Sequence, residues 1–118
     1  MRPANLFISR IAVIVATSVV MSAIALAVRA DDAKQLYEKN CVSCHGAAGK
    51  GDGPVGKLLK PPPKEFSAAL SGEGDAAIAK VIKEGGKAVG KSASMPAYGS
   101  KLSDEQIQGL AQYIKGLK

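Results

Sequence analysis

Apolar residues recur at helical spacing in three segments of the chain, and stretches rich in glycine and proline separate them. The spacing predicts helices over Asp32–Cys44, Asp75–Glu84 and Ser103–Leu117. The stretches Gly46–Lys64 and Gly86–Leu102 are predicted to be long, shaped loops, because glycines and prolines interrupt any regular element there. No segment alternates like a strand, so the pattern predicts an all-α domain with two long loops.

Helix ends are marked by capping residues in all three segments. Short polar side chains stand at the expected starts, and a glycine pair stands where the middle helix should end. The predicted capping positions are Asp32, Asp75, Gly85-Gly86 and the capping box of Ser103 with Gln106.

The first thirty residues differ in composition from the rest. Arg2 and Arg10 precede the apolar run Ile11–Val28, and small residues at Val28 and Ala30 suit a cleavage site. Ala25 and Ala27 offer a second cut. We therefore expect residues 1–30 to be a secretory signal peptide, residues 31–118 to form one periplasmic domain, and retention of the leader as a membrane anchor to be the alternative.

Composition limits what this domain can be. Residues 31–118 hold sixteen Leu, Ile, Val and Phe residues and no Trp, which is few for a core of their own. Thirteen Lys against ten acidic residues give these residues a net charge of +3, too mild for a dedicated nucleic-acid binder. The shortage of large apolar side chains suggests that something other than protein fills the middle.

Every Cys and the single His of the chain lie in Cys41-Val42-Ser43-Cys44-His45, a C-x-x-C-H motif. This motif is typical of covalent haem attachment: each thiol adds to a vinyl group, and the adjacent His becomes the proximal iron ligand. A structural disulfide, a thioredoxin-like redox pair and a zinc site are weaker alternatives. The disulfide would leave His45 unused, the redox pair lacks a βαβ setting, and zinc lacks further ligands.

Met95 is the single Met after residue 30, and it precedes Pro96 in the second loop rather than lying on a helix face. A thioether sulfur is a suitable ligand for the other face of a haem iron. A gap-filling core Met is the alternative role.

These motifs together resemble a class I c-type cytochrome. The segments Met95-Pro96-Ala97-Tyr98 and Leu102-Ser103-Asp104-Glu105-Gln106-Ile107 are also similar to those of the soluble photosynthetic cytochromes of algae and cyanobacteria. The segment Gly51-Asp52-Gly53-Pro54 is more similar to that of bacterial periplasmic monohaem cytochromes. The resemblance covers residues 32–118.

The resemblance implies a class I cytochrome c fold, with about three to four helices wrapped around one covalently attached haem c. It assigns Cys41 and Cys44 as thioether anchors and His45 and Met95 as iron ligands, and it suggests that the Pro54 carbonyl accepts the Nδ1 proton of His45. It also implies that the terminal helices cross, with Ala33 and Tyr37 meeting Leu110, Tyr113 or Gly109.

The expected function is single-electron transport by a soluble monomer, not catalysis, since both axial positions of the iron would be filled. Lysines beside both loops suggest docking of redox donors and acceptors with acidic faces, although an ordinary solvated surface explains them equally well. The alternatives are a haem enzyme or gas-binding domain with a labile sixth ligand, and a membrane-tethered subunit of an oxidase or dehydrogenase.

Overall fold

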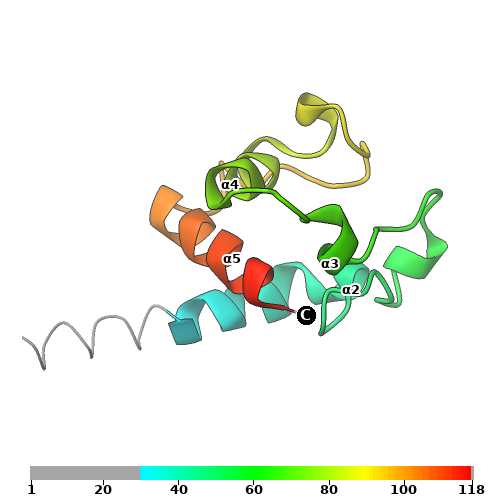
Figure 1. Ribbon diagram of the computed structural model, residues 1–118, viewed down its shortest axis with the longest axis horizontal. Helices are drawn as coiled ribbons and strands as arrows, with labels where there is room; N and C mark the ends of the chain where they lie inside the picture. The colour runs from blue at the N-terminus through cyan, green and yellow to red at the C-terminus, as the bar shows by residue number, and fades with distance from the viewer. Residues whose placement is uncertain (1–29, 118) are drawn as a thin grey trace, which may run out of the picture. The chain divides into compact units, whose positions relative to one another are not determined.

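A computed structural model describes residues 30–117. The predicted signal peptide therefore lies outside the described residues, apart from Ala30. Within residues 30–117 the regular structure is helical and contains no strand, which confirms the predicted all-α class (Figure 1).

The first helix covers residues 30–40, and α2 (Val42–His45) follows after a turn at Cys41. The Cys41 amide still donates to the Tyr37 carbonyl at 2.8 Å, so the two helices are nearly continuous. The predicted helix over Asp32–Cys44 is thus present but divided. The predicted Asp32 cap is wrong, because residues 30 and 31 are already helical.

The helices α4 (Asp75–Glu84) and α5 (Asp104–Gly116) form an antiparallel pair. Two ion pairs join their ends, Lys115 with Asp75 at 2.9 Å and Lys83 with Asp104 at 2.7 Å. The hydrogen bond to Asp104 raises the pKa of Lys83.

The predicted bounds of α4 are confirmed, and so is its end at Gly85, which has φ 82°. Its N-cap, however, is Gly74 rather than Asp75, because Asp75 is already the first helical residue. The Asp75 carboxylate pairs with Lys115. The capping box on α5 is confirmed: the Gln106 backbone amide donates to the Ser103 hydroxyl at 3.2 Å, and the Ser103 backbone amide donates to the side-chain oxygen of Gln106 at 3.0 Å.

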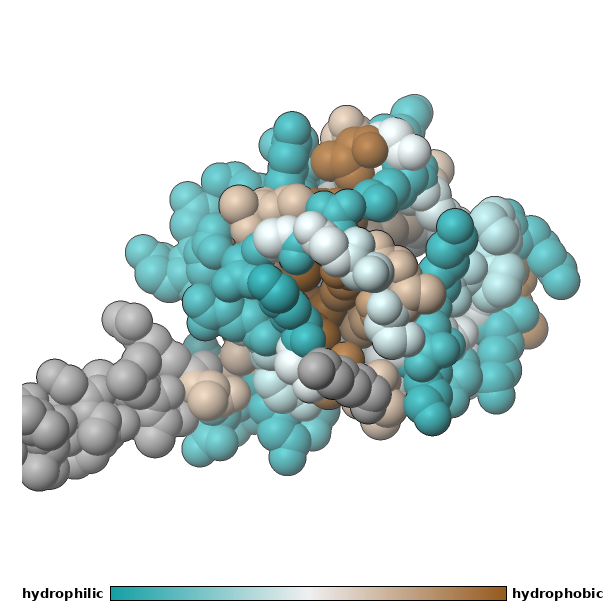
Figure 2. Space-filling model, viewed as in Figure 1, coloured by the Kyte–Doolittle hydropathy of each residue, from teal (hydrophilic) through white to brown (hydrophobic). Residues whose placement is uncertain are grey.

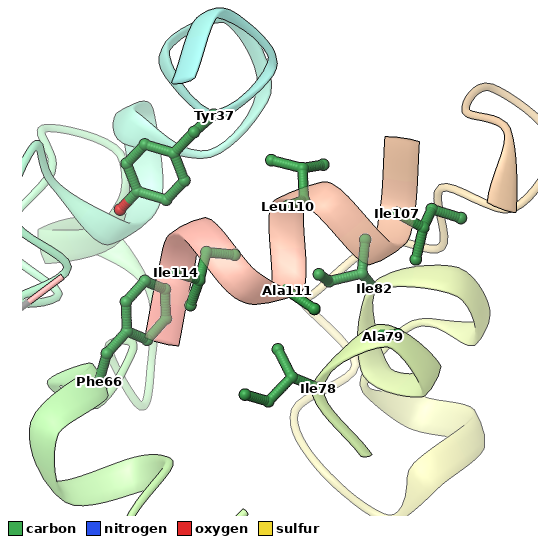
Figure 3. Close-up of a cluster of buried hydrophobic side chains, with 9 residues drawn as sticks. All are labelled: Tyr37, Phe66, Ile78, Ala79, Ile82, Ile107, Leu110, Ala111 and Ile114. Carbon is green, nitrogen blue, oxygen red and sulfur yellow. The ribbon is translucent and has the colours of Figure 1, made fainter. Parts of the chain in front are cut away.

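The core lies around α5, with the first helix on one side and α4 on the other (Figure 3). The Tyr37 and Tyr113 rings are 5.4 Å apart between centroids, and a Cβ built at Gly109 would lie 3.7 Å from that of Ala33. The predicted crossing of the terminal helices is therefore confirmed. The buried side chains are few, as the composition predicted: Ala33, Tyr37, Phe66, Ile78, Ala79, Ile82, Ile107, Leu110, Ala111 and Ile114.

The long loops contain short helices that the spacing did not predict. The 3₁₀ turns η1 (Gly56–Leu58) and η2 (Lys87–Val89) lie in the first and second loop, and α3 (Phe66–Ala69) follows the first loop. Elements this short leave no periodic pattern to detect. None of the helices described in residues 30–117 has the length and hydropathy needed to cross a bilayer.

Candidate haem site

One side of the site is the anchor wall, which we define as residues 30–56. Here α2 carries Cys44 and His45, and Cys41 lies one residue before it. The His45 amide donates to the Cys41 carbonyl at 2.9 Å, which holds the motif in a single helical turn. Both cysteines are free thiols, both are half-buried, and both line the same cavity as His45.

Burial shapes the chemistry of this wall. It raises the pKa of the Cys41 thiol to about 11, with a smaller contribution from Cys44. Burial also lowers the pKa of His45, which favours the neutral imidazole that a metal ion requires. The His45 ring stacks on Phe66 with centroids 4.7 Å apart and planes 29° apart.

The Nδ1 atom of His45 is the one buried side-chain nitrogen or oxygen within residues 30–117 that has no hydrogen-bond partner. The predicted bond from Nδ1 to the Pro54 carbonyl is therefore not formed. Instead, the first loop is held by Val55, the residue after Pro54, whose amide donates to the Ser43 carbonyl at 2.9 Å. Pro54 itself is exposed. Pro54 stays a proposal only as a partner acquired with bound haem.

Two glycines let the first loop lie directly on the attachment motif. A Cβ at Gly53 would overlap the carbonyls of Val42 and Ser43, and a Cβ at Gly56 would overlap that of Cys44. The Gly51 amide donates to the His45 carbonyl at 2.8 Å. The first loop thus follows the surface of α2 closely, which a chain with larger residues at these positions could not do.

The Met loop, which we define as residues 85–102, forms the other side. Its turn is held by the Gly86 amide, which donates to the Met95 carbonyl at 2.9 Å. Tyr98 joins this loop to two helices: its amide donates to the Ile82 carbonyl at 2.9 Å, and its hydroxyl donates to the Asn40 carbonyl at 3.1 Å. Burial raises the pKa of the Tyr98 phenol.

Between the two sides is a cavity of about 690 Å³. Figure 2 shows apolar side chains at the bottom of a hollow that hydrophilic residues surround. The predicted residues Cys41, Cys44, His45 and Met95 all line this cavity. Apolar side chains contributed by α3, α4 and α5 complete it, and they include Phe66, Leu70, Ile78, Val81, Ile82, Leu110 and Ile114.

The cavity fits a haem in size and chemistry. Its volume lies within the range usual for cofactor pockets, roughly 300 to 1,000 Å³. It offers two thiols, an imidazole and a thioether in a mostly apolar setting, and the unpartnered Nδ1 belongs to the predicted iron ligand. Within residues 30–117 no three His, Cys, Asp or Glu side chains gather as they would to hold a metal ion by themselves.

Phe66 is the residue of this site that the spacing did not reveal. It lies on α3, is 9% exposed and covers one face of His45. One observation could have identified it: Phe66 is the single Phe after residue 30, in a domain short of large apolar residues.

Comparison with known proteins identifies the family of the chain. Residues 28–114 match the profile of a family described as cytochrome c oxidase, cbb3-type, subunit III. The cbb3-type cytochrome c oxidase subunit CcoP of Azospirillum brasilense is 33% identical over 91 residues, which are 77% of this chain but 29% of that protein. The chain therefore spans less than a third of the oxidase subunit that it matches.

Shorter relatives are matched along most of their length. Cytochrome c6 of Thermosynechococcus vestitus is 32% identical over 92% of this chain and 88% of its own. Cytochrome c6 of Nostoc sp. is 37% identical over 78% of this chain and 74% of its own. The chain belongs to the class I c-type cytochromes, as an electron-transfer domain of the cbb3 subunit III family that carries covalently attached haem c.

Proposed function

We propose that this chain is a soluble, monomeric electron carrier of the periplasm, and that its haem c is bound to Cys41 and Cys44 and ligated by His45 and Met95. One observation carries the proposal: the Met loop brings Met95 to the same cavity as the C-x-x-C-H motif. The order of charged, apolar and small residues before Asp31 supports export.

Haem supplies an iron that changes between the ferrous and ferric states. The protein's part would be to supply both iron ligands. α2 and the stacked Phe66 ring would hold His45, and the Gly86 amide, which donates to the Met95 carbonyl, would hold the backbone of Met95. With both positions filled, no site stays open for a substrate, so we assign the chain no enzymatic activity.

The test is Met95→Ala in the haem-loaded protein, with Ser94→Ala as the matched control on the same loop. Met95→Ala should lose the weak far-red band of iron–sulfur ligation in the ferric state, lower the midpoint potential and bind carbon monoxide when reduced. It should keep its haem, because Cys41, Cys44 and His45 remain. Ser94→Ala should behave like the unsubstituted protein.

One result would contradict the proposed electron-carrier function. An unsubstituted protein that lacks the far-red band and binds carbon monoxide readily at neutral pH has an open sixth position. The carrier function would then give way to the alternative of a haem enzyme or gas-binding domain.

A second candidate function is that of a tethered subunit of an oxidase, which the match to the cbb3 subunit III family favours. Cell fractionation distinguishes the two. Haem protein in the periplasmic fraction with an N-terminus at Asp31, or at Val28 for the second cut, supports the soluble carrier. Haem protein found only in the membrane fraction with residues 1–30 intact supports the subunit.

A further inference from the structure

The surface of the first loop carries an unusual apolar pair. Val55 and Leu58 are 46% and 78% exposed, and they are the two large apolar residues that stand exposed within residues 30–117. Single exposed apolar residues are ordinary, but these two are three positions apart, with Val55 at the N-cap of η1 and Leu58 at its last residue. In a 3₁₀ turn, side chains three positions apart lie on the same side. One partner could therefore contact both side chains.

This surface is held in place by backbone hydrogen bonds. The Val55 amide donates to the Ser43 carbonyl at 2.9 Å, and the Lys57 amide donates to the Gly53 carbonyl at 3.0 Å. The Leu58 amide closes the turn on the Val55 carbonyl at 3.0 Å. A loop secured in this way loses little conformational entropy when a partner binds.

Between the flanking acidic residues Asp52 and Glu65, every charged side chain is a lysine. Lys57, Lys60 and Lys64 are exposed, and no acidic residue occurs between Gly53 and Lys64. None of the three lysines forms an ion pair with another residue of the described range, 30–117. We call Val55, Leu58, Lys57, Lys60 and Lys64 the η1 patch.

The η1 patch lies next to the haem attachment motif. Ser43, whose carbonyl holds Val55, stands between Cys41 and Cys44. The residues that follow the turn, Leu59 and Pro61 to Lys64, line the haem cavity. In Figure 1 the loop that carries η1 projects away from α4 and α5, so a partner could reach it without meeting those helices.

We propose that the η1 patch is the docking surface for a redox protein that presents an apolar spot surrounded by carboxylates. The apolar pair would supply the contact and the lysines would orient the partner. A second copy of this chain does not suit the site, since it would place lysines opposite lysines. The proposal rests on the proposed electron-carrier function and adds the place and chemistry of the encounter.

The experiment uses the haem-loaded full chain and gold electrodes as the partner surface. One electrode carries a mixed monolayer of carboxylate-terminated and methyl-terminated alkanethiols, and the other carries carboxylates alone. Voltammetry gives the rate of electron transfer to each. The variants are Leu58→Ser, Lys57→Glu and, as a control of equal charge change, Lys80→Glu, since Lys80 is an exposed residue of α4.

The unsubstituted protein should transfer electrons faster on the mixed monolayer than on carboxylates alone. Leu58→Ser should remove that advantage, with a loss of roughly fivefold on the mixed monolayer. Lys57→Glu should slow transfer on both surfaces, on the order of fivefold, while Lys80→Glu should not. The midpoint potentials in solution should stay unchanged.

Two results would overturn the docking surface: an unchanged rate for Leu58→Ser on the mixed monolayer, or equal losses for Lys57→Glu and Lys80→Glu. Voltammetry in solution separates this failure from that of the proposed function. If the unsubstituted protein shows a reversible one-electron response and only the surface effects are missing, the η1 patch alone is wrong. If that response is missing, the carrier function itself is wrong.

Discussion

The anchor wall and the Met loop face the same cavity, but different interactions secure them. In the anchor wall five glycines are buried, and the loop that they form lies against the carbonyls of α2. In the Met loop every residue from Lys87 to Ser94 except Val89 is exposed, and Met95 itself is half-buried. Local opening has a low free energy where backbone is exposed and few apolar contacts would be lost. The comparison indicates that the attachment motif is held more firmly than the loop that carries Met95, the proposed iron ligand.

Removing the anchors should have the largest effect. Cys41→Ala with Cys44→Ala should yield a chain without covalent haem and with little helical circular dichroism, because the cavity of about 690 Å³ then lacks the group that completes the core. Mass spectrometry and circular dichroism measure the two effects. Ser43→Ala, an exposed change between the cysteines, should keep both haem and helicity. Near-native helicity in the double variant would show that the side chains alone form a sufficient core.

A single methyl group in the anchor wall should have the next largest effect. Gly56→Ala would place a Cβ against the Cys44 carbonyl, a rigid backbone atom, so we expect a loss of about 3 kcal/mol in the free energy of unfolding. Gly116→Ala is the control, because nothing lies within 4 Å of a Cβ there and the residue is already helical. Denaturant titration of the haem-loaded proteins measures both. Equal midpoints would mean that the anchor wall is looser than its contacts indicate.

Tyr37 provides a pH test of the same wall. Its hydroxyl donates to the Gly46 carbonyl at 2.6 Å, and burial raises its pKa to about 12 from 10.0. The unfolded chain therefore loses the phenol proton first. The contribution of the protonated Tyr37 phenol to the free energy of unfolding is complete below about pH 10 and is lost as the pH rises from about 10 to 12. Over that interval the free energy of unfolding should fall by about 2 kcal/mol more in the unsubstituted protein than in Tyr37→Phe. Parallel pH curves for the two proteins would contradict the buried hydrogen bond.

The corresponding substitution in the Met loop, Tyr98→Phe, should have the smallest effect on stability. Tyr98→Phe keeps the ring but removes the hydrogen bond to the Asn40 carbonyl, at a cost of about 1 kcal/mol. Because this bond joins the Met loop to the end of the first helix, the far-red band should fade at lower denaturant concentration, ahead of the helical circular dichroism. In Tyr37→Phe the two signals should be lost together. Simultaneous loss in Tyr98→Phe as well would show that the Met loop does not open separately.

Local features of the sequence determined much of this protein. The bounds of α4 and the capping box of α5 depend on residues within one or two helical turns, so periodicity and capping rules predicted them. The C-x-x-C-H motif likewise combines its chemistry within five consecutive residues. Because these features depend on neighbours in the chain, they can be recognised before any contact is known.

Tertiary contacts decided the rest. Asp75 is the first residue of α4 rather than its cap, and its carboxylate accepts a hydrogen bond from Lys115, forty positions away in the chain. Phe66 reaches His45 from a helix of four residues, and Met95 lines the cavity because the Met loop is hydrogen-bonded to α4 through Tyr98 and Ile82. The His45 Nδ1 atom has no hydrogen-bond partner within residues 30–117, and the loop beside it is held instead by the Val55 amide, which donates to the Ser43 carbonyl. These features depend on contacts between residues that are distant in the sequence, and only the packing of those segments brings the residues together.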